Sequence, residues 1–454
     1  MIKITTVLSF AASLFTFLVG GFFTLKFKAF YIRHPLLFFR SMPIENGVRQ
    51  MLLSLGGTVG VGNIVGVAVA LSIGGSGAVF WMWVGAFFAM ALKYAEITLG
   101  MLKRRKENGI FKGGAPYYIK EKLGSLAAFV FATLLLCNAV FMGGMIQSSA
   151  ISEGWQTAFN ISPFVVGVIL SVFSALIFFL KVNLFSISAY VVPLMSIGYI
   201  IACLVIIFAN LQILPDVVND IFQNAFAAKS ASGGSLGIMF SPALREGILK
   251  GLFSNEAGCG TAPSAHVSSK EKEPCRQGLF GIFEVFADTL VMCTLTAFVI
   301  LISTEDGGFQ KSAAQICAHT FENFFGTLAP PILATFITLF AFCTIIAFGH
   351  YALEVLDFFC AGKTFKEAFV CVYCISLFLG AIATPYILWE ICDVIVCLML
   401  IINTSAVALS QKEIMVAHNR FYVHIGKYAS SASRMRVRSS FKTKNEMPIS
   451  DRER

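Results

Sequence analysis

The amino-acid sequence predicts an all-α polytopic membrane protein, and three observations carry this prediction. The chain has 454 residues, of which 57% are hydrophobic and 13% are charged, against about 25% charged residues in an ordinary soluble domain. The apolar residues form long continuous runs, as in residues 126–132, without the alternation of a membrane β-barrel. The basic residues collect between these runs. Together the observations exclude a soluble enzyme, a disordered protein and a nucleic-acid binder.

About eleven apolar segments follow one another along the chain. Most reach the roughly 20 residues that cross about 30 Å of hydrocarbon as a helix. The seventh differs from the others because charged residues such as Arg245 and Glu256 lie within it. In order, the predicted spans are residues 4–25, 48–73, 77–102, 125–151, 163–180, 186–209, 240–268, 276–302, 330–358, 365–382 and 385–410.

The distribution of Lys and Arg predicts the orientation of these spans. If the loop after the first span lies in the cytoplasm, the cytoplasmic side collects 28 of the 34 Lys and Arg residues, and the outside only Lys3, Lys229 and Lys311. We therefore expect a multi-pass protein of a bacterial inner membrane, with its N-terminus outside and its C-terminus in the cytoplasm. Residues 411–454 carry a net charge of +6, from ten basic and four acidic residues, and are expected to form a cytoplasmic tail attracted to anionic lipid.

The second span contains residues that a helix in lipid does not need. Five glycines stand among residues 56–66, and each costs about 1 kcal/mol of helix stability. Asn63 adds a polar amide at the middle of the span. A packing face of the GxxxG type is one explanation, since Gly56 and Gly60 have that spacing. The other explanation is an unwound segment, which is tolerated at membrane depth where it lines a cavity.

The seventh span repeats this pattern at residues 251–263, where Ser-Asn-Glu is followed by glycines and a proline. A loop outside the membrane would explain it, but the predicted orientation requires a crossing here. The two breaks open two sets of five spans, and because five is odd the second set enters from the opposite side. The sequence thus predicts an inverted repeat with a site at the membrane midplane. Its parts are an N-terminal region 1–46, a core 47–410 with repeats 47–210 and 240–410, and the tail 411–454.

A family resemblance is carried by these motifs. Residues 57–68 resemble the first break of the alanine or glycine:cation symporters, and residues 251–263 resemble the family stretch GLFSNEAGxGxAP. Further matches stand at residues 77–83, 93–96, 113–119 and 288–294. The matches extend in order over about residues 47–410. Residues 59–63 also resemble the first break of sodium-coupled neurotransmitter-type symporters, which share the five-plus-five fold of the bacterial leucine transporter.

The resemblance implies sodium-coupled uptake of alanine or glycine, with sodium as the coupling ion and no other cofactor. The sodium ligands that it implies are the side chains of Asn63 and Ser254 together with Asp288 or Thr289. A second ion is implied between the carbonyls of Gly56 and Val59 and the hydroxyl of Thr344. The neighbouring Cys343 departs from the family pattern, and a thiol is a poor ligand for sodium.

The resemblance also implies where the substrate binds. Its carboxylate is expected at the backbone N–H groups of Gly60, Val61 and Gly62. Its ammonium group is expected at the carbonyls around Ser254 and Asn255. Gln147 in the fourth span matches a family glutamine that reaches the substrate. Phe253 is either a wall of the pocket or a packing residue. No residue is expected to be catalytic.

Alternatives remain at this point. The same fold could carry a different small amino acid, or couple to protons through His350, whose ordinary pKa lies near neutrality. A membrane-embedded transferase is a distant alternative, since His350, Glu354 and Asp357 share one helical face, but no nucleophile or phosphate motif accompanies them. Lys93 and Glu96 stand one turn apart in the third span and are expected to form an ion pair.

Overall fold

The computed structural model describes residues 4–107, 109–227, 241–303, 321–322 and 324–423. The regular secondary structure of the described residues is helical, except for a short antiparallel hairpin in which β1 (Arg105–Glu107) pairs with β2 (Ile110–Lys112). The predicted all-α class is therefore confirmed. Eight helices are long and apolar enough to span a membrane, and a ninth span results if the bent pair at residues 44–74 is counted as one. The count of about eleven spans stays a prediction.

In the first half of the chain, helices lie at each of the first six predicted spans. The helices of the first repeat begin with a broken pair, α4 (Ile44–Thr58) and α5 (Val65–Gly74), which meet at an angle of 59° around the 3₁₀ turn η1 (Val61–Asn63). The others in this half are α1 (Ile4–Lys26), α2 (Phe30–Arg33), α3 (Pro35–Ser41), α6 (Gly77–Lys103), α7 (Ala115–Leu123), α8 (Ser125–Asn138), the π-helix η2 (Ala139–Ile146), α9 (Gln147–Phe159), α10 (Pro163–Phe179), α11 (Leu184–Ala209) and α12 (Leu214–Ala225).

The second half begins with another broken helix, as the inverted repeat predicts. α14 (Pro242–Asn255) ends in the middle of the seventh predicted span, and α15 (Ala262–His266) resumes after an irregular stretch. The remaining elements are α16 (Pro274–Val285), the π-helix η3 (Phe286–Cys293), α17 (Thr294–Ser303), η5 (Gly326–Leu328), α19 (Ala329–Phe358), α20 (Lys363–Ile382) and α21 (Pro385–Leu409).

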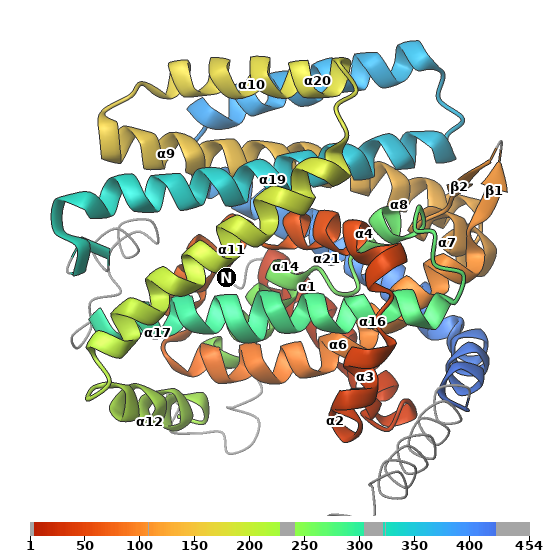
Figure 1. Ribbon diagram of the computed structural model, residues 1–454, viewed down its shortest axis with the longest axis horizontal. Coiled ribbons are helices and arrows are strands. Elements are labelled where there is room, and N and C mark those ends of the chain that lie inside the picture. The colour runs from red at the N-terminus through yellow and green to blue at the C-terminus, as the bar shows by residue number, and fades with distance from the viewer. Residues whose placement is uncertain (1–3, 108, 228–240, 304–320, 323, 424–454) are drawn as a thin grey trace, which may run out of the picture.

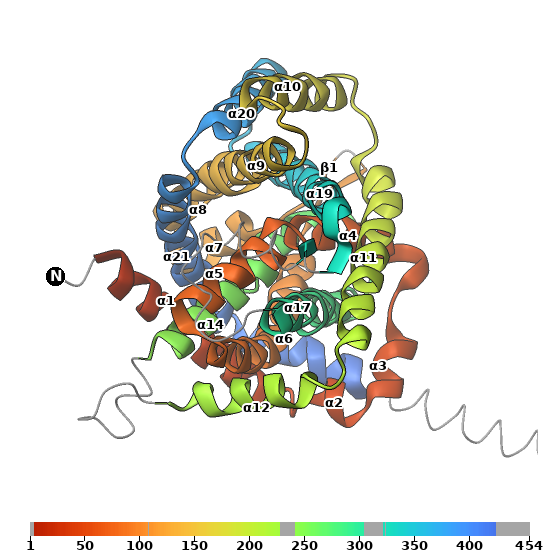
Figure 2. The same ribbon diagram turned by 90° about the vertical axis from the view of Figure 1, so that its left-hand side faces the viewer.

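The two broken helices lie together inside the bundle. α14 packs against α5 and along α6, and α6 also packs along α16 (Figure 1). α10 and α20 stack on each other outside α9 and α19 (Figure 2). Side chains on the outer helices are apolar and exposed, for example Leu194 and Phe208 on α11. This arrangement suits a bundle surrounded by lipid, and it encloses the polar breaks in protein.

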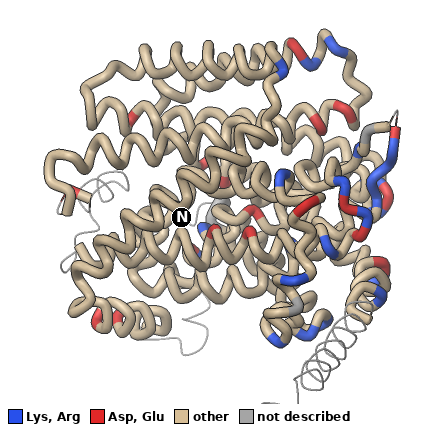
Figure 3. Tube along the Cα trace, in the orientation of Figure 1, with Lys and Arg blue, Asp and Glu red and all other residues tan. Residues whose placement is uncertain are grey.

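Charged side chains are distributed unevenly over the structure (Figure 3). Lys and Arg gather at one end of the bundle, on α2, α3, the β1–β2 hairpin, α7 and the beginning of α20. These segments belong to the loops that the sequence places in the cytoplasm. The opposite end, with α12, carries acidic residues but hardly any basic ones.

Candidate functional site

The backbone of the first break is capped by a side chain from the same segment. After α4 ends at Thr58, Gly60 is extended, and its N–H donates to Oδ1 of Asn63 at 3.0 Å. Gly60 is also required by space, because a Cβ at this position would lie 2.5 Å from Oγ1 of Thr344. The glycine thus allows α19 to approach the backbone of the break closely.

The second break uses a different backbone geometry. The backbone after the end of α14 is left-handed at three residues. These are Glu256 at φ 54°, Gly258 at φ 86° and Gly260 at φ 80°. Two of the three are glycines, which adopt this conformation without steric cost. The Glu256 carboxylate folds back and accepts a hydrogen bond of 2.6 Å from the Thr261 hydroxyl. The break is fully buried, so each of its polar groups needs a partner inside the protein.

Asp288 joins the two breaks. Its Oδ1 accepts a hydrogen bond of 2.7 Å from Nδ2 of Asn63, which follows the first break. Its Oδ2 accepts from the hydroxyls of Ser254 at 2.7 Å and of Thr289 at 2.9 Å. Asn255 extends the cluster by donating to the Thr289 hydroxyl at 3.1 Å. The structure therefore gathers all four residues that were expected to bind the first sodium ion, and all are buried.

The donor set of this cluster fits a small hard cation. It offers a carboxylate and two hydroxyls, and oxygen ligands are what such cations prefer, whereas the Asn63 amide oxygen accepts from the Gly60 N–H. The amide nitrogen of Asn63 donates a hydrogen bond to Asp288. This N–H group therefore contacts the carboxylate where a bound cation would contact it. One sulfur atom lies in the set, because Sγ of Cys293 is 3.4 Å from Nδ2 of Asn63 and 3.3 Å from Oγ of Ser254. Cys293 was not expected at the site from the sequence, since a cysteine in an apolar run resembles a packing residue.

Two π-helical stretches present the polar side chains of this site. Asp288 and Thr289 lie in η3, and Gln147 directly follows η2. π-helical turns inside α-helices are frequent at functional sites because they shift side chains out of the regular register. A search for a 3.6-residue period cannot detect them.

The residues expected around a second ion are partly brought together. The Thr344 hydroxyl donates to the Gly56 carbonyl at 3.1 Å and to the Phe340 carbonyl at 3.2 Å. Val59 follows at the end of α4 and is buried. The contact between Thr344 and Gly56 links α19 to α4, next to the close approach at Gly60.

The expected substrate residues border the first break. The N–H of Val61 lies 3.4 Å from Oε1 of Gln147, whose Nε2 donates to the Met142 carbonyl at 3.1 Å. Gly62 faces the second break, since a Cβ there would lie 3.7 Å from the Cα of Ser254.

An aromatic pair lies beside these residues. The rings of Phe253 and Trp389 are 5.5 Å apart. Trp389, Val61 and Ile146 help to line a cavity with about 310 Å³ of empty space, which includes open solvent. Trp389 was not expected from the sequence, because it stands in the eleventh span without a motif.

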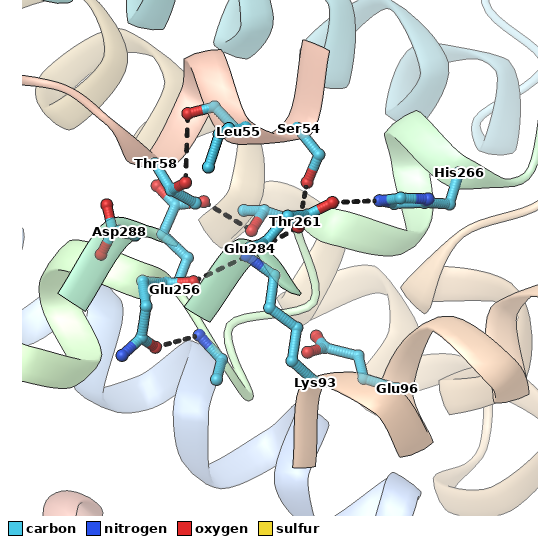
Figure 4. A network of polar contacts seen from close by, with 12 residues as sticks. Ser54, Leu55, Thr58, Lys93, Glu96, Glu256, Thr261, His266, Glu284 and Asp288 are labelled. Atoms are coloured by element: carbon cyan, nitrogen blue, oxygen red, sulfur yellow. Dashed lines mark hydrogen bonds and ion pairs between the residues drawn. The ribbon is translucent and has the colours of Figure 1, made fainter. Parts of the chain in front are cut away.

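The expected ion pair between Lys93 and Glu96 is wrong. Nζ of Lys93 pairs with Oε2 of Glu284 at 3.0 Å, and both side chains are fully buried (Figure 4). Oε1 of Glu284 contacts Nε2 of His266 at 2.7 Å, and the Ser54 hydroxyl donates to Oε2 at 2.8 Å. Glu284 lies far from Lys93 in the sequence, whereas Glu96 was the near neighbour that spacing suggested.

The residues of the transferase alternative do not form one polar cluster. The His350 ring packs edge-on against Phe185, with centroids 5.1 Å apart. Asp357 instead pairs with Lys366 at 2.7 Å, at the beginning of α20.

Comparisons with known proteins give the family. The sequence model of the sodium:alanine symporter family matches residues 2–433. A Bacillus subtilis protein with the provisional name of sodium/proton-dependent alanine carrier is 34% identical over 88% of this chain and 87% of its own. Another, with the provisional name of sodium/glutamine symporter, is 33% identical over 80% and 76%. The sodium/alanine symporter AgcS of Methanococcus maripaludis is 32% identical over 76% and 77%.

The fold has a solved counterpart. A substrate-bound, outward-open Na⁺-coupled sialic acid symporter matches with a TM-score of 0.53 and 11% identity, over 86% of this chain and 81% of its own. At that identity the match shows the fold alone. The family match spans nearly the whole chain, and the relatives are transporters of similar length. The chain therefore belongs to the sodium:alanine symporter family, and it is a multi-pass membrane transporter and not an enzyme.

Proposed function

We propose that this protein couples the uptake of a small neutral amino acid, alanine or glycine, to sodium entry by alternating access. The observation that carries the proposal is the position of Asp288, which receives hydrogen bonds from Asn63 at the first break and Ser254 at the second. A cation bound here would take oxygen ligands from both broken helices at once. Ion binding would then favour one arrangement of the two repeats over the other, which is the requirement for coupling.

Each residue of the ion site has a role in this proposal. Asp288 supplies the negative charge, and the hydroxyls of Ser254 and Thr289 supply neutral oxygen ligands. Asn63 would turn its amide oxygen toward the ion, since its nitrogen now donates to Asp288. Thr344, with the carbonyls of Gly56 and Val59, would form the second ion site.

The substrate would lie against the first break. Its carboxylate would accept from the N–H groups of Gly60, Val61 and Gly62, where the oxygen of Gln147 now lies near Val61. Its ammonium group would be met by the carbonyls around Ser254 and Asn255. Lys93 donates to the Asn255 carbonyl, which leaves one lone pair on that oxygen.

Close packing around the first break supports a small substrate. The rings of Phe253 and Trp389 lie against each other at a tilt of 42° beside the site, and the glycines of the first break bring helices into close approach. One relative is named for alanine and another for glutamine, so the test must compare these two amino acids as substrates.

Uptake into proteoliposomes tests the substrate and the ion together. Radiolabelled alanine should accumulate when a sodium gradient is imposed and not when a pH gradient is imposed alone. Unlabelled glycine should compete, whereas leucine and glutamine should not. Equal competition by glutamine would overturn the substrate proposal. Full uptake with choline in place of sodium, driven by a pH gradient, would instead support proton coupling, which one relative's name includes.

We also propose that the N-terminus lies outside and the C-terminus in the cytoplasm. The gathering of Lys and Arg at one end of the bundle supports this orientation (Figure 3). A single cysteine in a cysteine-free background should be labelled from outside at position 216, in α12, and only from inside at position 366, in α20. The reverse labelling would overturn the orientation.

A further inference from the structure

The second break carries two charged partners that both come from α6. Nζ of Lys93 donates to the Asn255 carbonyl at 2.8 Å, at the point where α14 ends. The Glu96 carboxylate accepts from the N–H of Gly258 at 3.0 Å and of Gly260 at 2.5 Å, within the break itself. Both side chains are fully buried. An ammonium group thus lies at the carbonyl end of the break (Figure 4), and a carboxylate lies at its amide groups.

These charges match the backbone groups that they contact. The last carbonyls of a helix carry partial negative charge and have no partner within the helix, so a cation there is favourable. Free N–H groups in an unwound stretch favour an anion in the same way. An amino-acid substrate has one ammonium and one carboxylate. Lys93 and Glu96 therefore offer the second break the pair of charges that a free amino acid would offer.

We infer that Lys93 and Glu96 form a tethered zwitterion that permanently occupies the second break, with the Lys93 ammonium standing where a coupling cation would otherwise be needed. The inference rests on the proposed function, because it assigns a different role in substrate binding to each of the two breaks. The first break binds the substrate carboxylate. The second break is held in shape by the chain itself and meets the substrate ammonium only with carbonyl lone pairs that Lys93 leaves free. Lys93 and Glu96 are positioning residues in this account.

Further contacts fix both charges in place. Glu284 of α16 holds Lys93 at 3.0 Å and is itself held by His266 and Ser54. The Asn403 amide of α21 donates to Oε1 of Glu96 at 2.9 Å.

The chain of contacts on the Glu96 side continues to α7. Asn403 also donates to the Gly258 carbonyl at 2.8 Å and accepts from the Tyr118 hydroxyl at 2.6 Å. Each charge is therefore fixed by helices outside the break. Such fixed groups lose no translational freedom when substrate binds, unlike an ion taken from solution.

A purely structural ion pair is the competing explanation for Lys93, and the two make different predictions. If Lys93 serves only to neutralise Glu284, replacing both charged residues with neutral ones should restore function. If the ammonium is needed at the Asn255 carbonyl, that double replacement should remain defective. A small cation from solution should then repair it.

The test measures binding of radiolabelled alanine to the purified full-length protein, with and without ethylammonium. Lys93→Ala should weaken binding about tenfold or more, since a hydrogen bond from a charged donor is lost. Ethylammonium at tens of millimolar should recover most of this loss, and choline, which is too large and has no N–H, should not. Lys122→Ala replaces a lysine at the proposed cytoplasmic surface. This variant should bind alanine as the unmodified protein does, and ethylammonium should not change its binding.

The double variant Lys93→Ala with Glu284→Gln covers the case in which Lys93→Ala fails to fold around an unpaired carboxylate, and it leaves the space that ethylammonium needs. Its thermal unfolding confirms the fold, and its binding should be weak and respond to ethylammonium. Full binding without amine, or no response to amine in the folded double variant, would overturn the inference. Sodium dependence of alanine binding in the unmodified protein tests the proposed function separately, because it does not involve either variant.

Discussion

The two breaks resemble each other in sequence but differ in how their backbones are stabilised. In the first break, Gly60 is extended and its N–H is capped by Asn63. The second break turns through left-handed residues and is capped by Lys93 and Glu96 from α6. In the first break, glycine therefore allows a neighbouring helix to approach the backbone closely. In the second break, it allows a left-handed backbone conformation. The first break depends on residues of the ligand site, whereas the second is completed by fixed charges from another helix.

This difference suggests which break responds to ligands. A break that is already satisfied by side chains gains little from a ligand, because its polar groups have partners. The first break exchanges weak contacts, such as the 3.4 Å contact between Val61 and Gln147, for stronger ones when a carboxylate arrives. Asp288 contacts residues of both breaks, and in the proposed function it would transmit the effect of the ion to both.

The largest effect is expected from Asp288→Asn. This change keeps the shape of the side chain but removes the charge that both breaks share, so sodium-driven alanine uptake should fall about 100-fold or more. The expectation corresponds to roughly 3 kcal/mol, the upper range for a hydrogen-bonded charge. Uptake in proteoliposomes at saturating sodium measures it.

Asp357→Asn is the matched control for that experiment. Asp357 is a half-buried acid at the end of α19 that pairs with Lys366, away from both breaks. Its replacement should change uptake less than twofold. Equal uptake by Asp288→Asn and the unmodified protein would show that Asp288 does not join the two breaks in function.

The glycines of the two breaks should fail in different ways. An alanine at Gly260 would be left-handed at φ 80°, and its Cβ would lie 2.4 Å from the Phe131 ring. Strain and overpacking of this kind cost about 1–3 kcal/mol each, so Gly260→Ala should lower the thermal stability of the purified protein. Gly60→Ala meets the Thr344 hydroxyl at 2.5 Å and should reduce uptake with a smaller loss of stability.

Gly66→Ala gives the reference for both glycine variants, because no atom lies within 4 Å of a Cβ at that position. Its uptake should match that of the unmodified protein, and its stability should be equal or slightly higher, because alanine favours a helix over glycine by up to about 1 kcal/mol. The comparison of the breaks is wrong if Gly60→Ala unfolds at a lower temperature than Gly260→Ala.

Local patterns predicted the parts of the site that stand near them in the sequence. Both breaks could be predicted because glycine and Asn63 are out of place in a lipid-facing helix. Asn63, Ser254, Asp288 and Thr289 do converge, as the family resemblance implied. The fold class followed from composition and from charge distribution.

Partners across the bundle could not be predicted from spacing. Lys93 had a neighbouring acid one turn away, yet it pairs with Glu284, which tertiary packing brings to the other side of α6. Trp389 and Cys293 look like ordinary packing residues until the helices are assembled. The π-helices also break the regular period on which sequence patterns depend.

A smaller effect is expected from removing one neutral ligand from each break. Asn63→Ala and Ser254→Ala should each raise the sodium concentration for half-maximal uptake about tenfold, since a lost ligand costs on the order of 1–1.5 kcal/mol. By reciprocity, each should raise the alanine concentration for half-saturation of binding at fixed sodium. Sodium titrations of uptake, with protein abundance matched, measure both. An effect confined to one variant would show that the ion contacts one break only.

The smallest effect is expected far from both breaks, at Glu413. Its carboxylate pairs with Lys103 at 2.7 Å and with Lys122, and hydrogen bonds from these lysines hold the pKa of Glu413 below its usual range. A lowered pKa means that the pair stabilises the fold above the pKa of the unfolded chain, about 4.3, and that this contribution is lost as the pH falls through the lower folded value. Because the pair is partly exposed, Glu413→Gln should cost less than about 1 kcal/mol at pH 7. Thermal unfolding should show a small difference at pH 7 that shrinks as the pH falls below about 4.3, while sodium-driven uptake stays within twofold. A large loss of uptake at pH 7 would mean that the surface around Glu413, and not the contrast between the two breaks, limits transport.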